Sequence, residues 1–212
     1  MTGPIDAITA IHNAARKAMS GFDQAAVGRA KGESGYDTAF QPLHLFNELV
    51  SWHAQGEELA LFPLVETVAP SLAEDYARDH RELTNAGASL EAAISAGDKL
   101  EAARVAAAFK LHLHIHLAKE DTHLYPLLKQ RKTESDLYSA VGQSFSTIPK
   151  ERMPEVNNVL FMLMGNDDRE HLIRVWQKVM PPKDFARMRE LIRPAVGNDW
   201  SELTRRIPGL GG

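Results

Sequence analysis

The sequence predicts an all-α protein, and three observations support this class. Hydrophobic residues make up 44% of the 212 residues, many segments are rich in alanine, and β-branched residues almost never cluster. Apolar residues recur at helical spacing over four long stretches that are joined by short connections. Four long helices with short connections favour an antiparallel four-helix bundle. At this length the chain can bury a large core.

The first helix is expected over residues 4–20 and can run on to about residue 30, because Pro4 suits a first helical position. One stripe of this helix combines apolar residues with a histidine: Ile5, Ile8, His12, Ala15 and Met19. Residues 28–41 are rich in Gly, Ser and Asp and predict a loop. The second helix opens at Pro42, and Pro63 is expected to kink or end it.

The starts of the third and fourth helices are predicted from capping-box spacing. Ser71 with Glu74 indicates the start of the third helix, and Asp98 with Glu101 indicates the start of the fourth. The fourth helix is expected over 99–130, where a cluster of basic residues suits a helix C-terminus.

Residues 133–212 predict an extension of shorter helices separated by Pro and Gly, after a bundle domain formed by residues 1–132. Its helices are expected near residues 134–147, 154–164, 167–179, 183–194 and 198–206. The extension contains too many apolar residues for a free tail. We therefore expect it to pack on the bundle, on itself, or on a second copy of the chain in a homodimer.

Composition excludes several classes of function. The chain has no cysteine, which leaves His and carboxylates as the strong metal donors. The net charge is −4, and Lys and Arg are for the most part scattered among acidic residues, so the chain has no extended basic surface for binding nucleic acid. The N-terminus does not resemble a signal peptide, and no apolar run is long enough to span a membrane. We therefore expect a cytoplasmic protein with neither a nucleic-acid nor a membrane partner.

A sequence repeat carries the strongest functional signal. His53 to Val65 (HAQGEELALFPLV) returns as His116 to Leu128 (HLAKEDTHLYPLL), with His, Glu, Leu, an aromatic residue, Pro and Leu at matching positions. In each copy His and Glu are four residues apart, so they project from one face of a helix. A single pair of this kind is usually a solvated polar pair, but the duplication predicts a pair of metal ions.

Two further histidines, His12 and His80, lie on the apolar stripes of the first and third helices. A lone histidine on such a face is usually a hydrogen-bonded core residue. Here every helix of the bundle supplies one inward histidine, and the repeated helices each add a Glu. Burying these groups without a cation would cost several kcal/mol per unpaired charge. The predicted metal ligands are His12, His53, Glu57, His80, His116 and Glu120.

The order and spacing of these six residues resemble the haemerythrin-like, HHE cation-binding domain, and the resemblance covers about residues 4–130. It implies a four-helix bundle with two non-haem iron ions, with the Glu side chains bridging the irons and the His side chains divided between them. Mn or Zn also accept these donors. No catalytic residue or organic cofactor site is assigned beyond this set.

The sequence departs from the oxygen-carrier pattern of that family at two positions. Thr84 stands where the carriers have a further His, and Glu120 follows its His at four residues where the carriers have Asp at five. Asp121 is expected to point about 100° further round the helix. Each metal would then have four protein donors and up to two open positions, which favours redox reaction or sensing over reversible carriage.

Other polar residues are expected to lie outside the ligand set. His112 and His123 lie near the ligand face of the fourth helix and are interpreted as polar caps or as partners of a ligand carboxylate. Glu58 is interpreted as a solvated neighbour of Glu57, and Tyr36 as a packed loop residue. The remaining histidines are interpreted as structural or exposed: His44, His114 and His171.

These observations predict a non-haem di-iron oxidoreductase that removes peroxide or activates dioxygen. The alternative is a module that senses or binds oxygen, NO or iron without turnover, with the extension transmitting the change. Metal storage and a plain helical interaction protein are the remaining hypotheses.

Overall fold

The computed structural model describes residues 3–36 and 38–211. Residues 1–2, 37 and 212 lie outside the described residues. They belong to the predicted 1–132 domain, the predicted 28–41 loop and the predicted 133–212 extension, respectively. Every regular element in the described ranges is helical, which confirms the predicted all-α class.

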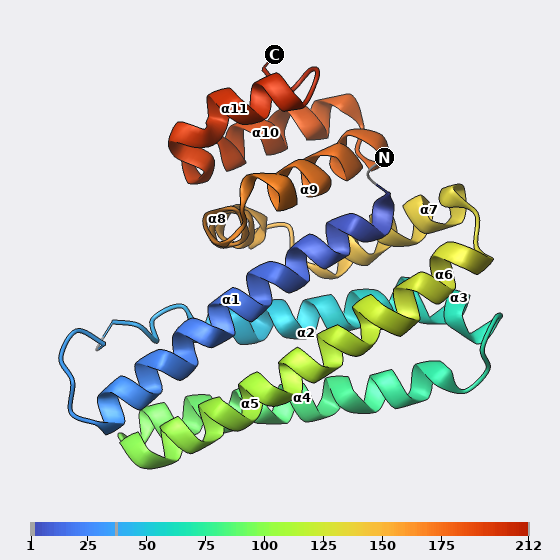
Figure 1. Cartoon of the computed structure of the whole chain (residues 1–212). Helices are drawn as coiled ribbons and strands as arrows, with labels where there is room; N and C mark the ends of the chain where they lie inside the picture. Colours follow the sequence, from blue (N-terminus) through green and yellow to red (C-terminus); the bar gives the residue numbers. More distant parts are fainter. Residues whose placement is uncertain (1–2, 37, 212) are drawn as a thin grey trace.

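Four long helices lie side by side and alternate in direction, as Figure 1 shows. They are α1 (Pro4–Ala30), α2 (Leu43–Ala60), α4 (Leu72–Ser95) and α5 (Lys99–Lys119). Around the bundle, α1 contacts α2 and α5, and α4 contacts α2 and α5. None of the helices in the described ranges combines the length and the apolar character needed to cross a lipid bilayer.

The helix α4 begins where the sequence predicted, with Ser71 at the N-cap position, but its capping interaction differs from the prediction. Ser71 has φ 70°, in the left-handed region, and its side chain does not cap the helix, so the predicted Ser71–Glu74 capping box is wrong. The Glu66 carboxylate instead accepts hydrogen bonds from the backbone N–H of Ser71 (3.0 Å) and Ala73 (3.3 Å). At α5 the predicted cap is present, because Asp98 accepts from the backbone N–H of Glu101 at 2.9 Å.

This difference gives a test of which side chain starts α4. Glu66→Ala is expected to lower the free energy of unfolding by about 1 kcal/mol, the usual cost of losing an N-terminal cap. Ser71→Ala should change it much less, because the hydroxyl caps nothing. Urea denaturation of both variants measures the difference, and equal losses would contradict the role of Glu66.

Both copies of the repeat interrupt their helix just before the aromatic residue. The helix α2 ends at Ala60, and α3 (Phe62–Glu66) restarts with Pro63 in its first turn, as the sequence predicted. The expected continuous fourth helix is wrong in detail: after α5, residues Glu120–Leu124 form a π-helix (η1), followed by α6 (Tyr125–Arg131). Pro126 has no N–H to donate, and π-helical turns are frequent at functional sites.

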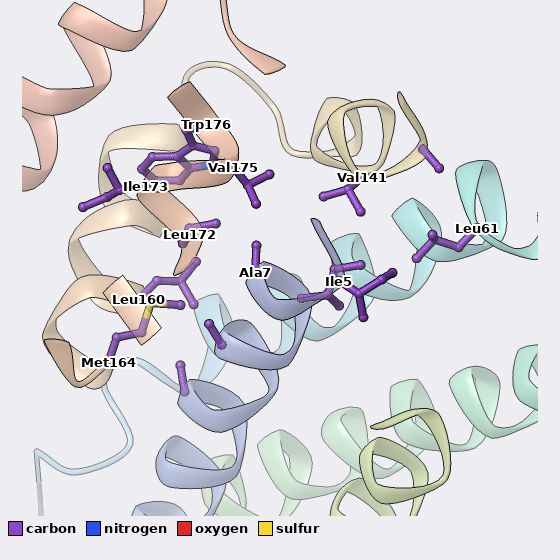
Figure 2. Packing of buried hydrophobic residues seen from close by; sticks show 14 of the residues in the cluster. Ile5, Ala7, Leu61, Val141, Leu160, Met164, Leu172, Ile173, Val175 and Trp176 are labelled. Carbon is purple, nitrogen blue, oxygen red and sulfur yellow. The ribbon is translucent and has the colours of Figure 1, made fainter. Parts of the chain in front are cut away.

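The extension folds back onto the bundle. It consists of α7 (Glu134–Ser144), the 3₁₀ turn η2 (Phe145–Thr147), α8 (Met153–Leu163), α9 (Asn166–Val179), α10 (Pro182–Val196), the 3₁₀ turn η3 (Gly197–Asp199) and α11 (Trp200–Arg206). Helices α7, α8 and α9 contact α1, while α7 and η2 contact α2. Leu160 and Leu172 share a buried cluster with Ile5 and Ala7 (Figure 2). Because this core crosses residue 132, the division into two domains stays a prediction.

A glycine allows the extension to approach α2 closely. A Cβ atom on Gly56 would lie 2.6 Å from the backbone oxygen of Ser144, at the end of α7. Next to this contact, the Thr147 hydroxyl donates to the backbone oxygen of Trp52 at 2.8 Å. Because Gly56 has no side chain, the end of α7 and the following turn η2 can lie directly against α2.

Gly56→Ala is expected to destabilise the fold by about 1–3 kcal/mol, because the added methyl group overpacks this contact. Gly21→Ala is the matched control: Gly21 lies inside α1 with open space around it, so the same change should stabilise the chain by about 0.4–1 kcal/mol. Thermal unfolding of both variants tests the opposite signs. Stabilisation by both substitutions would contradict this prediction, because it would show that α2 and α7 can move apart without a loss of stability.

Candidate metal centre

The structure brings all six predicted residues together inside the bundle. His12 comes from α1, His53 and Glu57 from α2, His80 from α4, His116 from α5, and Glu120 opens η1. All except His53 are almost completely buried, and the side chain of His53 is 20% exposed. Residues separated by more than a hundred positions therefore meet in one polar cluster within an apolar core.

The six side chains form two groups of four that share both carboxylates. One group contains His12, His53, Glu57 and Glu120, and the other contains Glu57, His80, His116 and Glu120. Within each group one donor atom per residue lies within 4.8 Å of the others. Each group can hold a metal ion, with Glu57 and Glu120 between the two positions.

Three of the histidines are oriented by a carboxylate on their outer ring nitrogen. His12 Nδ1 lies 3.0 Å from Asp121, His80 Nδ1 lies 2.8 Å from Glu58, and His116 Nδ1 lies 3.4 Å from Asp79. A neutral imidazole that donates from Nδ1 presents a lone pair on Nε2. Metal-binding histidines usually have this outer partner, which fixes the ring and its tautomer.

Several inward atoms lack a hydrogen-bond partner among the described residues: Glu57 Oε2, both carboxylate oxygens of Glu120, and His80 Nε2. His80 Nε2 lies 3.3 Å from Glu57 Oε2, and His116 Nε2 lies 3.1 Å from Glu120 Oε1. Lone pairs that face one another in a buried site repel unless a cation or a proton lies between them. The donor set therefore fits bound metal ions.

The pKa values of the metal-free cluster also indicate a need for positive charge. Burial by itself lowers the pKa of His80, but the Glu120 and Glu57 carboxylates raise it to about 10. Burial by itself raises the pKa of Glu120, but His116 and His80 hold it well below its ordinary value. In the metal-free cluster, a proton on His80 Nε2 thus supplies the positive charge that a bound cation would otherwise supply.

Comparison with known families agrees with this geometry. Residues 71–142 match the family model of the hemerythrin HHE cation binding domain. The haemerythrin-like character predicted from the sequence is confirmed, over about a third of the chain. No curated protein and no solved structure matches the chain.

The HHE match covers only part of the donor set. His80, His116 and Glu120 lie within the matched residues, whereas His12, His53 and Glu57 precede them. The inclusion of these three residues in the candidate metal centre therefore rests on their convergence in the structure. The match also extends past residue 132 into α7.

Tyr125 is a further residue of the centre that the sequence reasoning did not single out. Its hydroxyl donates to Glu57 Oε1 and lies 3.3 Å from His12 Nε2, and its ring stacks on His12 at 5.5 Å. Burial, together with Glu120 and Glu57, raises the pKa of Tyr125 well above its ordinary value, so the hydroxyl stays protonated. In the other copy of the repeat, Phe62 stacks on His80 at 5.4 Å and brings no hydroxyl. The sequence signal that could have identified Tyr125 is its place in the repeat, at the aromatic position that Phe62 occupies in the first copy.

The outer carboxylates were also underestimated. Glu58 is 43% exposed and lies outside both donor groups, as expected for a solvated neighbour, but it also accepts from His80 Nδ1, a role that the sequence did not indicate. Asp121 lies outside both donor groups and joins His12 to Arg16, whose guanidinium donates to it at 2.6 Å. Asp79 accepts from His116 and from Lys119. No sequence motif marked the role of Asp79.

The other histidines and Tyr36 lie outside the donor groups. His112 and His123 are exposed, with His123 beside the Thr122 hydroxyl, and His44 lies near Glu91 on the surface. Tyr36 lies in the loop that follows α1, and its ring packs on Gly28 of α1. His114 and His171 are half-buried. The Thr84 hydroxyl donates to the backbone oxygen of His80 at 3.0 Å, in place of a further imidazole.

Proposed function

We propose that the chain is a non-haem di-iron oxidoreductase that reacts with dioxygen or peroxide at an open dinuclear centre. The observation that carries this proposal is the pair of donor groups sharing Glu57 and Glu120, with inward atoms that lack partners. His12 and His53 would hold one metal ion, and His80 and His116 the other. The HHE match supports metal binding, and the choice of iron over Mn or Zn follows the family resemblance.

Each group supplies two nitrogen donors and two shared carboxylates, which leaves up to two positions of an octahedron open. Iron, when bound, supplies one-electron redox chemistry and Lewis acidity. Thr84 supports a centre with open coordination positions, because its hydroxyl donates to the backbone oxygen of His80 and adds no ligand to the donor group that contains His80.

The chain's own residues would hold the centre and control protons. Asp121, Glu58 and Asp79 orient three imidazoles, so that their Nε2 atoms face the carboxylates. Tyr125 keeps its proton and donates it in a hydrogen bond to Glu57, which fixes that carboxylate and places one O–H beside the His12 side. The apolar core around the donors, including Leu61, Leu113 and Leu117, excludes bulk water.

A second candidate is a module that senses oxygen, NO or iron without turnover. The packing of the extension favours it: α7, α8 and α9 contact α1, which carries His12, and α7 and η2 contact α2, which carries His53. A change in the centre that shifts either helix would therefore reach residues 133–212.

Optical spectra of the iron-loaded protein separate these functions. The protein is reduced, exposed to air, degassed, and treated with peroxide, with the Zn-loaded protein as control. We expect repeated consumption of dioxygen or peroxide without loss of iron. A spectral change in air that reverses fully on degassing, without consumption of either oxidant, would favour binding or sensing instead.

A further inference from the structure

A cavity of about 70 Å³ lies beside the donor groups, between the bundle and the extension. Its walls come from all four long helices of the bundle, from Ser144 at the end of α7, and from the segment from η2 to α8. Its inner end reaches Glu57 and all four donor histidines: His12, His53, His80 and His116. The cavity is therefore closed on one side by residues beyond the HHE match, which ends at residue 142.

The walls away from the donors are apolar. They include Leu49, Trp52, Phe145, Ile148, Leu160 and Leu163. Two hydroxyl groups also lie at the cavity, but both donate to backbone oxygens: Ser144 to Val141 at 2.8 Å, and Thr147 to Trp52 at 2.8 Å. The cavity wall therefore offers little to compensate the lost hydration of a polar ligand.

Charge in the lining is confined to the donor end, where Glu57 is acidic. No lysine or arginine lines the cavity, so in the metal-free protein a carboxylate or phosphate ligand would meet Glu57 without a counter-ion. His53 is the most exposed of the six donors and lines the same cavity. The cavity thus leads to both donor groups, and His53 is the donor at the cavity that is most accessible to solvent.

Size limits the ligand further. An apolar cavity of about 150 Å³ stays dry and binds benzene or xenon, and about 10–15 Å³ is needed to hold one water. A cavity of about 70 Å³ accordingly takes a molecule of a few heavy atoms.

We propose that this cavity binds a small uncharged organic molecule, with its hydrocarbon part between α2 and the η2–α8 segment and its one polar atom toward His53. The inference rests on the proposed function for its chemical purpose, since it names the substrate class that the centre would act on. The cavity itself is formed by the fold and can be tested separately from the metal.

Xenon is the first probe, because it reports an apolar cavity without any polar contact. Xenon NMR of the full-length protein, metal-depleted and iron-loaded, should show saturable binding in both forms, and a xenon-pressurised crystal should place the atom between Trp52 and Ile148. Iron content is measured in the same samples. If the protein binds iron but not xenon, this inference is overturned and the metal proposal still stands. If it binds xenon but not iron, the metal proposal is overturned and the cavity inference still stands.

Ala54→Leu is the filling variant, because Ala54 lines the cavity and its counterpart in the repeat is already Leu117. It should reduce xenon binding at least tenfold. Ala118→Leu, on the exposed face of α5, is the matched control and should leave binding unchanged. Ile148→Ala tests the opposite direction by enlarging the cavity, and it should increase xenon binding. Unchanged binding in both Ala54→Leu and Ile148→Ala would place xenon elsewhere and overturn the proposal.

The ligand class is tested with 1-propanol and propionate, which have similar size but differ in charge. Ligand-observed NMR with the metal-depleted full-length protein, in which propionate cannot bind to iron, should show 1-propanol binding at least tenfold more tightly than propionate, with the difference lost in Ala54→Leu. Equal binding of both, or tighter binding of propionate, would contradict an uncharged ligand.

Discussion

Glu120→Ala is expected to remove both metal ions from the chain, whereas His53→Ala should leave about one. Glu120 belongs to both donor groups, but His53 belongs to only one of them. Loss of a shared carboxylate leaves each group with one carboxylate and two imidazoles. It also removes the charge that the His80 and His116 side chains face.

Metal content after iron loading and dialysis measures this prediction, with circular dichroism to confirm that the helices persist. Glu48→Ala is the control: it removes a carboxylate from α2 that pairs with Arg152 at 2.6 Å and lies outside both groups. It should keep the iron content of the parent chain. Retention of two ions by both Glu120→Ala and His53→Ala would refute the donor set.

Asp121→Asn is expected to weaken metal binding by about 10–100-fold, the usual effect of losing an outer partner of a ligating histidine. Asp121 holds His12 Nδ1 at 3.0 Å and is itself held by Arg16, and these contacts keep its pKa below the ordinary value despite burial. A neutral amide removes the charge that makes the His12 ring a better donor. The iron affinity, measured by competition with a chelator, reports the change.

Asp23→Asn provides the matched control. Asp23 lies on α1, the helix that carries His12, and pairs with Lys110 at 2.7 Å, but it lies outside both donor groups. Its substitution should leave iron affinity within about twofold. An equal loss in both variants would show that Asp121 acts only through general charge or stability.

The sequence predicted the bundle well because its signals are local. Helical spacing of apolar residues and the positions of Pro4 and Pro63 depend on neighbours along the chain, and α1 and α2 lie close to where these signals place them. The position of the α4 start was predicted correctly, but its cap was not, because the cap comes from Glu66, across a turn whose backbone conformation no spacing rule revealed.

The donor residues were accessible from sequence for a related reason. A His and a Glu four residues apart face one side of any helix, and their repetition at 53 and 116 placed the same chemistry on two helices. The outer carboxylates gave no such signal. Asp121 reaches His12 beside the π-helical turn, and Asp79 meets His116 from another helix.

The sequence by itself determined an all-helical chain with an inward histidine on each of four helices and a donor carboxylate on two of them, because period and residue type are local properties. Only the tertiary structure decided how the two donor groups share Glu57 and Glu120, and where the extension lies. Those features depend on contacts between distant residues. The approach of Ser144 to Gly56 and the cavity that reaches the donor histidines exist only after the helices have packed.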